Sequence, residues 1–366
     1  MLSIRTVAAT GVGALIAVLL IAVLAMASGA AAQETVKLRF TLDWKLQGIH
    51  AWYFWAQEKG YFAAEKLDLT IDQGEGSAAT VTRIMSGAYD AGFGDINAIV
   101  QNAATRPGEA PVMVYMIYNK APFALLTRAE SPIRTFKDLS GRKLGTPPGG
   151  ASFKLLPLLA KKSGIDYATI NVLNVAPNLQ EQMLLQGQVD VIAIFTATSY
   201  MNLVALKLDP DKDFRWMFYS DAGIDLYSNG VMASPKLIRE RPEAVKGLVR
   251  AINRAMREVL ASPDAAIDLL TKKEPLLDRE IEKQRLLYVT RTLIATPEAA
   301  ELGAGDVNDA RMNAAIDAIV AAFELPRTPA AGDVFSRAFL PPKSERSPGR
   351  VANDREGPSH IGRGAR

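Results

Sequence analysis

An aspartate followed by a tryptophan, at the end of an expected strand, gives the clearest chemical signal in this sequence. Residues 36–42 alternate apolar with charged or polar side chains, as a half-buried strand does, and Asp43 and Trp44 follow directly. In α/β sheets, ligands bind outside the carboxyl ends of the strands. An indole offers a flat stacking surface, and a carboxylate accepts hydrogen bonds from amines or ring N–H groups. We therefore predict that Asp43 and Trp44 bind a ligand.

Other polar and glycine-rich segments occupy similar junctions between an expected strand and a helix. Gly76 and Ser77 open a helix after the expected strand 67–72, and free N–H groups there favour an anion or another acceptor, although Ser77 could be only a helix cap. Asp95 is either a helix N-cap or a second ligand carboxylate. Ser152 follows a glycine-rich loop, and Phe195 and Thr196 end an apolar strand. The predicted ligand-binding residues are Asp43, Trp44, His50, Gly76, Ser77, Asp95, Asn119, Ser152, Phe195, Thr196 and Tyr227.

Catalytic and metal-binding signatures are scarce. The chain has no cysteine and two histidines, His50 and His360. This excludes thiolate nucleophiles, thiolate metal sites and disulfides. We find no nucleophile beside a base, no metal-ligand spacing and no Walker-type phosphate loop. His50 and Asp43 could form an acid–base pair, but a histidine at a helix start among aromatic residues more often packs or contacts a ligand. The sequence therefore predicts neither an enzyme nor a metal or cofactor site.

The aromatic residues around that motif are expected to belong mainly to the core. Trp52 and Trp55 lie on an expected helix over residues 49–59, which Gly60 ends. Large aromatic side chains on such a helix are usually buried. We therefore expect Trp52 and Trp55 to pack in the core, unlike Trp44 in its loop.

Two runs of alternating strands and helices predict an α/β fold with two lobes and a ligand cleft between them. Each lobe is expected to hold a mostly parallel sheet flanked by helices. The interrupted strand over residues 112–127 and the return strand over 225–233 carry the chain between the lobes, which places Asn119 and Tyr227 at the crossings. The expected divisions are residues 33–119 and 228–342 for the first lobe and 120–227 for the second. Such lobes commonly close on a solute by a hinge.

The N-terminus has the features of an export signal. Arg5 precedes an apolar run over residues 7–26, and Ala30-Ala31-Ala32 fits a cleavage site before Gln33. Residues 1–32 are therefore a predicted signal peptide, and the body a predicted periplasmic protein. The apolar run approaches the ~20 residues that span a bilayer, so an uncleaved anchor is the alternative.

The C-terminal residues 343–366 are rich in Arg, Ser, Gly and Pro and are predicted to be a disordered basic tail. They account for most of the basic excess behind the net charge of +3, so the composition gives little support to nucleic-acid binding.

Several separated motifs together resemble a known family. They are DWKLQGIHAWYFWAQEKGYF, QGEGSAATVTRIMSGAYDAGFGD, TFKDLSGRKLGTPPGGAS and IDLYSNGVMASPKLIRERPEAVKGLVRAI, in that order. The chain is similar to the periplasmic solute-binding proteins of ABC importers, in the group that takes nitrate, sulfonates, taurine and thiamine-pyrimidine precursors. The resemblance covers residues 36–342 and implies a type II periplasmic binding fold, a monomer, and an ABC permease with its ATPase as partners.

Within that group, Asp-Trp after the first strand resembles the pyrimidine-precursor branch. There the tryptophan stacks on the heterocycle and the carboxylate contacts its amine, which the resemblance carries over to Trp44 and Asp43. The chain departs from that branch at Lys45-Leu46, where Pro-Asn is common, and at residues 195–198, where a carboxylate is common. A small heterocyclic or aromatic solute is therefore the expected ligand. A sulfonate or nitrate-type anion, a sensor subunit and an exported enzyme using His50 and Asp43 are the alternatives.

Overall fold

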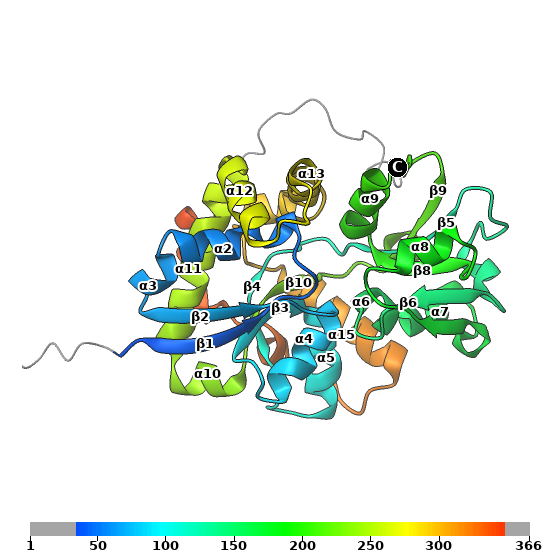
Figure 1. The fold of residues 1–366 in the computed structure, drawn as a ribbon. Helices are drawn as coiled ribbons and strands as arrows, with labels where there is room; N and C mark the ends of the chain where they lie inside the picture. Colours follow the sequence, from blue (N-terminus) through cyan, green and yellow to red (C-terminus); the bar gives the residue numbers. More distant parts are fainter. Residues whose placement is uncertain (1–33, 348–366) are drawn as a thin grey trace, which may run out of the picture. The chain divides into compact units, whose positions relative to one another are not determined.

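The computed structural model describes residues 34–347, which form two five-stranded sheets flanked by helices (Figure 1). The predicted signal peptide lies outside the described residues, as do residues 348–366 of the predicted tail. No helix within residues 34–347 is both long and apolar enough to cross a membrane.

The first sheet, called sheet A here, has the strand order β2-β1-β3-β10-β4. Strand β1 pairs with β3 in parallel, and β10 runs antiparallel to both β3 and β4. The members of sheet A are β1 (Val36–Thr41), β2 (Leu67–Asp72), β3 (Ala91–Asp95), β4 (Val112–Met116) and β10 (Asn229–Ala233).

The second sheet, called sheet B, has the order β7-β6-β8-β5-β9. Strand β6 pairs in parallel with β7 and β8, whereas β5 runs antiparallel to β8 and β9. Its members are β5 (Phe123–Arg128), β6 (Lys143–Thr146), β7 (Asn171–Asn174), β8 (Val191–Phe195) and β9 (Phe214–Phe218).

The reversed strand of each sheet is the first strand after the chain crosses from the other sheet. Strand β5 follows the crossing from β4, and β10 follows the crossing from β9. The two crossing segments also pair with each other, because Tyr118 N donates to Asn229 O (2.7 Å) and Ser228 N donates to Tyr118 O (3.2 Å). The broken strand and the return strand expected from the sequence are thus adjacent, and the type II periplasmic binding fold is confirmed.

The helices lie between and around these strands. In chain order they are α2 (Ala51–Glu58), α3 (Tyr61–Ala64), α4 (Ser77–Met85), α5 (Ile96–Thr105), α6 (Ala151–Lys154), α7 (Leu156–Ser163), α8 (Gln180–Leu185), α9 (Thr196–Ala205), α10 (Pro235–Glu240), α11 (Pro242–Ala261), α12 (Asp264–Lys273), α13 (Arg279–Val289), α14 (Pro297–Leu302), α15 (Asp309–Phe323) and α16 (Ala331–Val334).

Shorter turns of helix complete the list. A 3₁₀ turn, η1 (Gly48–His50), precedes α2, and a π-helical turn, η5 (Thr290–Ile294), continues α13. The other 3₁₀ turns are η2 (Phe136–Leu139), η3 (Tyr167–Thr169), η4 (Tyr219–Ala222), η6 (Arg337–Phe339) and η7 (Lys343–Glu345).

The tryptophans of α2 divide between the core and its edge. The side chain of Trp52 is completely buried, as expected. Trp55 is only half-buried, and its indole N–H donates to the Glu258 carboxylate of α11 at 3.0 Å. Trp55 therefore ties α2 to α11 rather than filling the core. Helix α2 gives way to α3 at Gly60, whose φ of +68° suits glycine.

Residues 343–347, at the start of the predicted disordered tail, are ordered in the structure, and this corrects the predicted boundary at Lys343. Residues Lys343–Glu345 form a 3₁₀ turn, and Arg346 is 5% exposed. The Arg346 guanidinium donates to the backbone oxygens of Pro341 (2.8 Å) and Ala304 (2.8 Å). From the sequence, a basic residue in a segment of low hydrophobicity is expected to be exposed to solvent. Arg346 is buried instead, because its guanidinium supplies hydrogen-bond donors to backbone carbonyls that would otherwise be buried without them.

Candidate functional site

A cavity lies between the loops of sheet A and those of sheet B, with about 590 Å³ of space not occupied by protein atoms. That figure includes space that is open to solvent. The residues that line it are Asp43, Trp44, Gln47, Ile49, Ser77, Tyr118, Pro122, Pro147, Gly150, Ala151, Ser152, Gln180, Ala193, Ile194, Phe195, Ala197, Thr198, Ser199 and Leu293.

Asp43 lies at the cavity wall but is already strongly bonded within the protein. It is 3% exposed. One carboxylate oxygen lies 2.7 Å from His50 Nε2, and the other accepts from Asn229 Nδ2 at 2.8 Å. Asp43 therefore joins η1 to the start of β10, and this fixes the loop that carries Trp44.

His50 lies behind the cavity wall and does not line it. Its side chain is completely buried. The Gln47 backbone N–H donates to Nδ1 (3.1 Å), which assigns the ring proton to Nε2, facing Asp43. Both ring nitrogens are thus engaged inside the protein. The arrangement holds η1 in place and leaves His50 no free nitrogen for a bound molecule.

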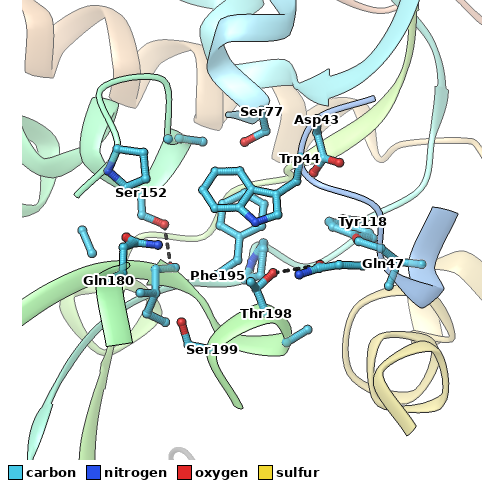
Figure 2. Close-up of a pocket in the computed structure, with 18 of the residues that line it drawn as sticks. Asp43, Trp44, Gln47, Ser77, Tyr118, Ser152, Gln180, Phe195, Thr198 and Ser199 are labelled. Atoms are coloured by element: carbon cyan, nitrogen blue, oxygen red, sulfur yellow. Dashed lines mark hydrogen bonds between the residues drawn. The ribbon is translucent and has the colours of Figure 1, made fainter. Parts of the chain in front are cut away.

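Two aromatic side chains occupy the middle of the cavity in the close-up view. Trp44, from the loop after β1, and Phe195, at the end of β8, lie at the centre of Figure 2, with Ser152 and Gln180 to one side and Gln47 and Tyr118 to the other. Both rings are partly exposed, unlike the core aromatics. Rings that keep exposed faces in a cavity can stack on a planar ligand.

The wall contributed by sheet B is rich in hydroxyl and amide groups from three helix starts. Ser152 Oγ donates to Ile194 O (2.7 Å), and Ser199 Oγ donates to the buried Glu181 carboxylate (2.6 Å). Thr198 Oγ1 lies 3.3 Å from Gln47 Oε1 and bonds across the cavity to the sheet A side. Gln180, the first residue of α8, is 3% exposed.

The cavity lining is poor in positive charge. The lining residues include no lysine or arginine, and Asp43 is the one acidic residue among them. Tyr118 remains a neutral phenol, because burial, reinforced by the nearby Asp43, raises its pKa well above the usual value. A site of this kind suits a neutral or cationic ligand better than an anion, since a buried anion needs a compensating charge.

The start of α4, where an anion was a predicted ligand, is occupied by the protein itself. The backbone N–H groups of Ala78 and Ala79 donate to the carbonyl of Gly149, in the loop after β6, at 3.2 and 3.3 Å. A Cβ on Gly76 would lie 2.1 Å from that same oxygen. Gly76 thus allows the two loops to touch, and Ser77 turns its side chain to the cavity without capping α4.

Asp95 lies at the N-terminus of α5, where it accepts from the backbone N–H groups of Asn97 (3.0 Å) and Ala98 (3.2 Å). Its other oxygen lies 3.1 Å from the Ser228 hydroxyl. Burial raises the pKa of this carboxyl to about 6. Asp95 does not line the cavity and is an N-cap, one of the two roles expected for it.

Asn119 and Tyr227 lie on the two crossing segments and outside the cavity lining. Asn119 Nδ2 donates to the Glu298 carboxylate of α14 at 2.9 Å, and the Tyr227 hydroxyl donates to the same oxygen. Thr296 also donates to Asn119 Oδ1 (2.7 Å). A single carboxylate therefore ties both crossings to α14, which makes these two residues part of the connection between the sheets.

Of the predicted residues, the cavity brings together Asp43, Trp44, Ser77, Ser152 and Phe195. His50, Gly76, Asp95, Asn119, Thr196 and Tyr227 do not line it. The polar lining residues that the sequence reasoning missed are Gln47, Tyr118, Gln180, Thr198 and Ser199.

The missed residues differ in how visible they are in the sequence. Gln47 and Thr198 fall inside motifs that the sequence analysis singled out, so a wider window around each motif would have found them. Gln180 follows no glycine-rich turn or strand end of its own and gives no local signal.

A family model described as NMT1/THI5 like matches residues 47–266. The chain belongs to this family. One relative is the riboflavin-binding protein RibY of Chloroflexus aurantiacus, 26% identical over 241 residues, which are 64% of this chain and 66% of that protein, just under two thirds. Another is the 4-amino-5-hydroxymethyl-2-methylpyrimidine phosphate synthase of Legionella pneumophila, 25% identical over 275 residues, 72% of this chain and 84% of that protein.

Solved structures with the same fold include periplasmic binding proteins. The alkanesulfonate-binding protein SsuA of Xanthomonas axonopodis pv. citri superimposes with a TM-score of 0.62 at 18% identity, over 83% of this chain and 99% of that one. The aliphatic sulphonate-binding SsuA of Escherichia coli gives 0.59 at 16% identity, over 81% and 91%. These similarities establish the fold, and the expected resemblance to the solute-binding group is confirmed.

Proposed function

We propose that this NMT1/THI5-like protein is the extracytoplasmic solute-binding subunit of an ABC importer and captures a small planar nitrogen heterocycle. The observation that carries the proposal is the lining of the cavity, in which two partly exposed aromatic rings are combined with buried hydrogen-bonding groups and no cation. A ring stacks on Trp44 or Phe195, and its polar edge meets the amide and hydroxyl groups. The protein delivers this solute, as a monomer, to a permease and its ATPase.

The names of two relatives support this ligand class. One refers to riboflavin and the other to an aminopyrimidine, both planar nitrogen heterocycles. Sulfonate, the ligand named for the two SsuA proteins, is a poorer fit to this cavity. A bound sulfonate would meet Asp43 without a lysine or arginine to offset it.

Capture without chemistry is favoured over catalysis by the state of His50 and Asp43. A general base needs a free nitrogen or oxygen within hydrogen-bond reach of the reacting atom. His50 instead donates to Asp43 and accepts from the Gln47 backbone, behind the cavity wall. A His50→Gln variant that binds a heterocycle as the wild type does, with neither form turning it over, would agree with capture alone.

Contacts between the two sides of the cavity support closure around the solute. Arg285 of α13 donates to the backbone oxygens of Ala197 (3.1 Å) and Thr198 (2.8 Å) in α9. Its buried partner Glu282 accepts from Gly48 N in η1 at 2.6 Å. The pair therefore links η1, which Gln47 immediately precedes, with α9, which carries Thr198. Exclusion of water from such a closed site strengthens each hydrogen bond to the ligand.

The test is a thermal-shift screen of the purified protein. The panel holds aminopyrimidines, flavins and other heterocycles, together with alkanesulfonates, nitrate, bicarbonate and aromatic acids. A ligand at a hundred times its dissociation constant should add about 2.7 kcal/mol to the free energy of unfolding. Stabilisation by heterocycles and not by sulfonate or nitrate is expected. Stabilisation by the anions alone would overturn the ligand class, and no saturable binding at all would overturn the capture function.

A further inference from the structure

Gln180 lines the cavity and has a fully buried polar atom that is left without a partner. Its side chain is 3% exposed and lines the cavity, and its carbonyl oxygen is buried with no hydrogen-bond donor in the structure. The neighbouring hydroxyls differ, since Ser152, Thr198 and Ser199 each bond to another protein group. An unpaired buried carbonyl has lost its hydrogen bonds to water without a replacement, so native proteins rarely retain one without a reason.

The position of Gln180 makes a ligand the natural partner. It is the first residue of α8, on the sheet B side, and faces the cavity beside Ser152 (Figure 2). The carboxylate across the cavity is less available, because both oxygens of Asp43 already accept hydrogen bonds from His50 and Asn229. A hydrogen-bond donor on the ligand would therefore find a free acceptor at the Gln180 carbonyl, whereas the Asp43 oxygens already accept hydrogen bonds.

The carboxamide also defines which ligand edge fits. It carries an acceptor and an N–H₂ donor side by side, and rotation of the terminal amide exchanges their positions at little cost. Such a group pairs in a bidentate manner with an edge that presents a donor next to an acceptor, as glutamine does with adenine. Lactams and amino groups beside a ring nitrogen both have this edge.

We propose that Gln180 is the specificity-determining residue of the cavity and binds a ligand edge on which an N–H donor and an acceptor are adjacent. This inference rests on the proposed capture of a heterocycle and adds to it the group that selects among heterocycles. Trp44 and Phe195 supply stacking that any planar ring can use, whereas Gln180 distinguishes rings by their polar edge.

The experiment is a calorimetric titration with two compounds of the same shape, 4-amino-2-methylpyrimidine and 2,4-dimethylpyrimidine. They differ in one amino group, which a methyl group replaces. Gln180→Met keeps the length of the side chain and removes its hydrogen-bonding groups. Gln101→Met is the matched control, because Gln101 also has an unpartnered buried amide atom but lies on α5 and does not line the cavity.

We expect the wild type and Gln101→Met to prefer the amino compound by about 10-fold to 100-fold. In Gln180→Met, that preference should fall to about threefold or less, with the affinity for the dimethyl compound nearly unchanged. Gln180→Glu, which keeps an acceptor and loses the donor, should retain part of the preference. Melting curves of the unliganded variants show whether each one is folded.

The outcomes separate the inference from the function on which it rests. A wild type that binds and discriminates, together with a folded Gln180→Met that discriminates equally, overturns the role of Gln180 and leaves capture intact. A wild type that binds heterocycles without discriminating between the two compounds also overturns it. A wild type that binds no heterocycle, including flavin lactams, overturns the proposed function as well.

Discussion

The two walls of the cavity are built in opposite ways. On the sheet A side, Asp43 and His50 are bonded to each other and to neighbouring protein groups before any ligand arrives. On the sheet B side, the hydroxyls of Ser152 and Ser199 are also bonded to protein groups, but Gln180 has a buried oxygen without a donor. The sheet A wall is thus pre-organised, and the sheet B wall keeps hydrogen-bonding capacity for the ligand.

This difference distinguishes residues that stabilise the structure of the site from residues that bind the ligand. A polar group whose bonds are satisfied internally rigidifies its surroundings, whereas one that is partly satisfied is costly until it finds a partner. Substitution of Asp43 is therefore expected to change mainly the stability of the folded protein. Substitution of Gln180, on the opposite wall, is expected to change mainly the affinity for the ligand.

The largest expected effect comes from breaking the pre-organised wall. Asp43→Ala leaves the donors of His50 and Asn229 buried without acceptors, so it should lower the free energy of unfolding by about 3–5 kcal/mol. Urea denaturation of the unliganded protein measures this. The control is Asp68→Ala on the exposed face of β2, which should change stability by about 0.5 kcal/mol or less. Equal effects of the two substitutions would show that Asp43 does not support the wall.

A second test uses the pH dependence of the polar groups behind that wall. The pKa of Asp95 rises from 3.8 to about 6 on folding, so the folded state holds this proton more tightly than the unfolded chain. Stability contributed by Asp95 is therefore present at low pH and lost as the pH rises from about 4 to about 6.

Comparison with Asp95→Asn isolates this effect, since asparagine caps a helix about as well as aspartate. The free energy of unfolding of the wild type minus that of Asp95→Asn should fall by about 2 kcal/mol between pH 4 and pH 7. Urea denaturation at several pH values gives the difference, with Asp68→Asn as the exposed control. A difference that stays constant with pH would place the Asp95 carboxyl in a solvated environment.

A third test concerns one of the contacts between the two walls, that of Gly149 with the start of α4. A Cβ on Gly149 would lie 2.9 Å from the Ala79 side chain, so Gly149→Ala forces the loop away from α4. Overpacking of this kind costs about 1–3 kcal/mol. Under the proposed closure around the solute, that cost falls on the closed form alone. We expect the dissociation constant of a bound heterocycle to rise by roughly 5-fold to 150-fold while the unliganded stability hardly changes.

Gly332→Ala, where a Cβ would meet no atom within 4 Å, is the control for Gly149→Ala. Unchanged affinity in Gly149→Ala would show that the Gly149 contact is not needed for closure on the ligand.

The sheet A wall was the more predictable part of the site. Asp43 and Trp44 are adjacent in the chain, follow a strand with a clear period, and stand among aromatics that mark the motif. The alternation of strands and helices was equally informative for the fold, because hydrophobic periodicity and glycine turns are local signals.

The sheet B wall was less predictable because its residues come from separate segments. Gln180, Ser152 and Thr198 meet only when three helix starts converge, and no local pattern marks α8 as one of them. Conversely, Asn119 and Tyr227 were expected at the ligand because they lie where the chain crosses between sheets. Their partner Glu298 is more than seventy residues away in sequence, and that long-range contact decides their role.

The most direct test of ligand capture in this cavity is a fluorescence titration of the wild type and of Trp44→Phe with a heterocycle that stabilises the protein. Trp44 is the tryptophan that lines the cavity, whereas Trp52 is fully buried in the core. A ligand stacked on Trp44 should change the emission of the wild type saturably. Trp44→Phe should lose most of that change and still bind by calorimetry. A Trp44→Phe titration with the full wild-type signal would place the ligand elsewhere and contradict the account.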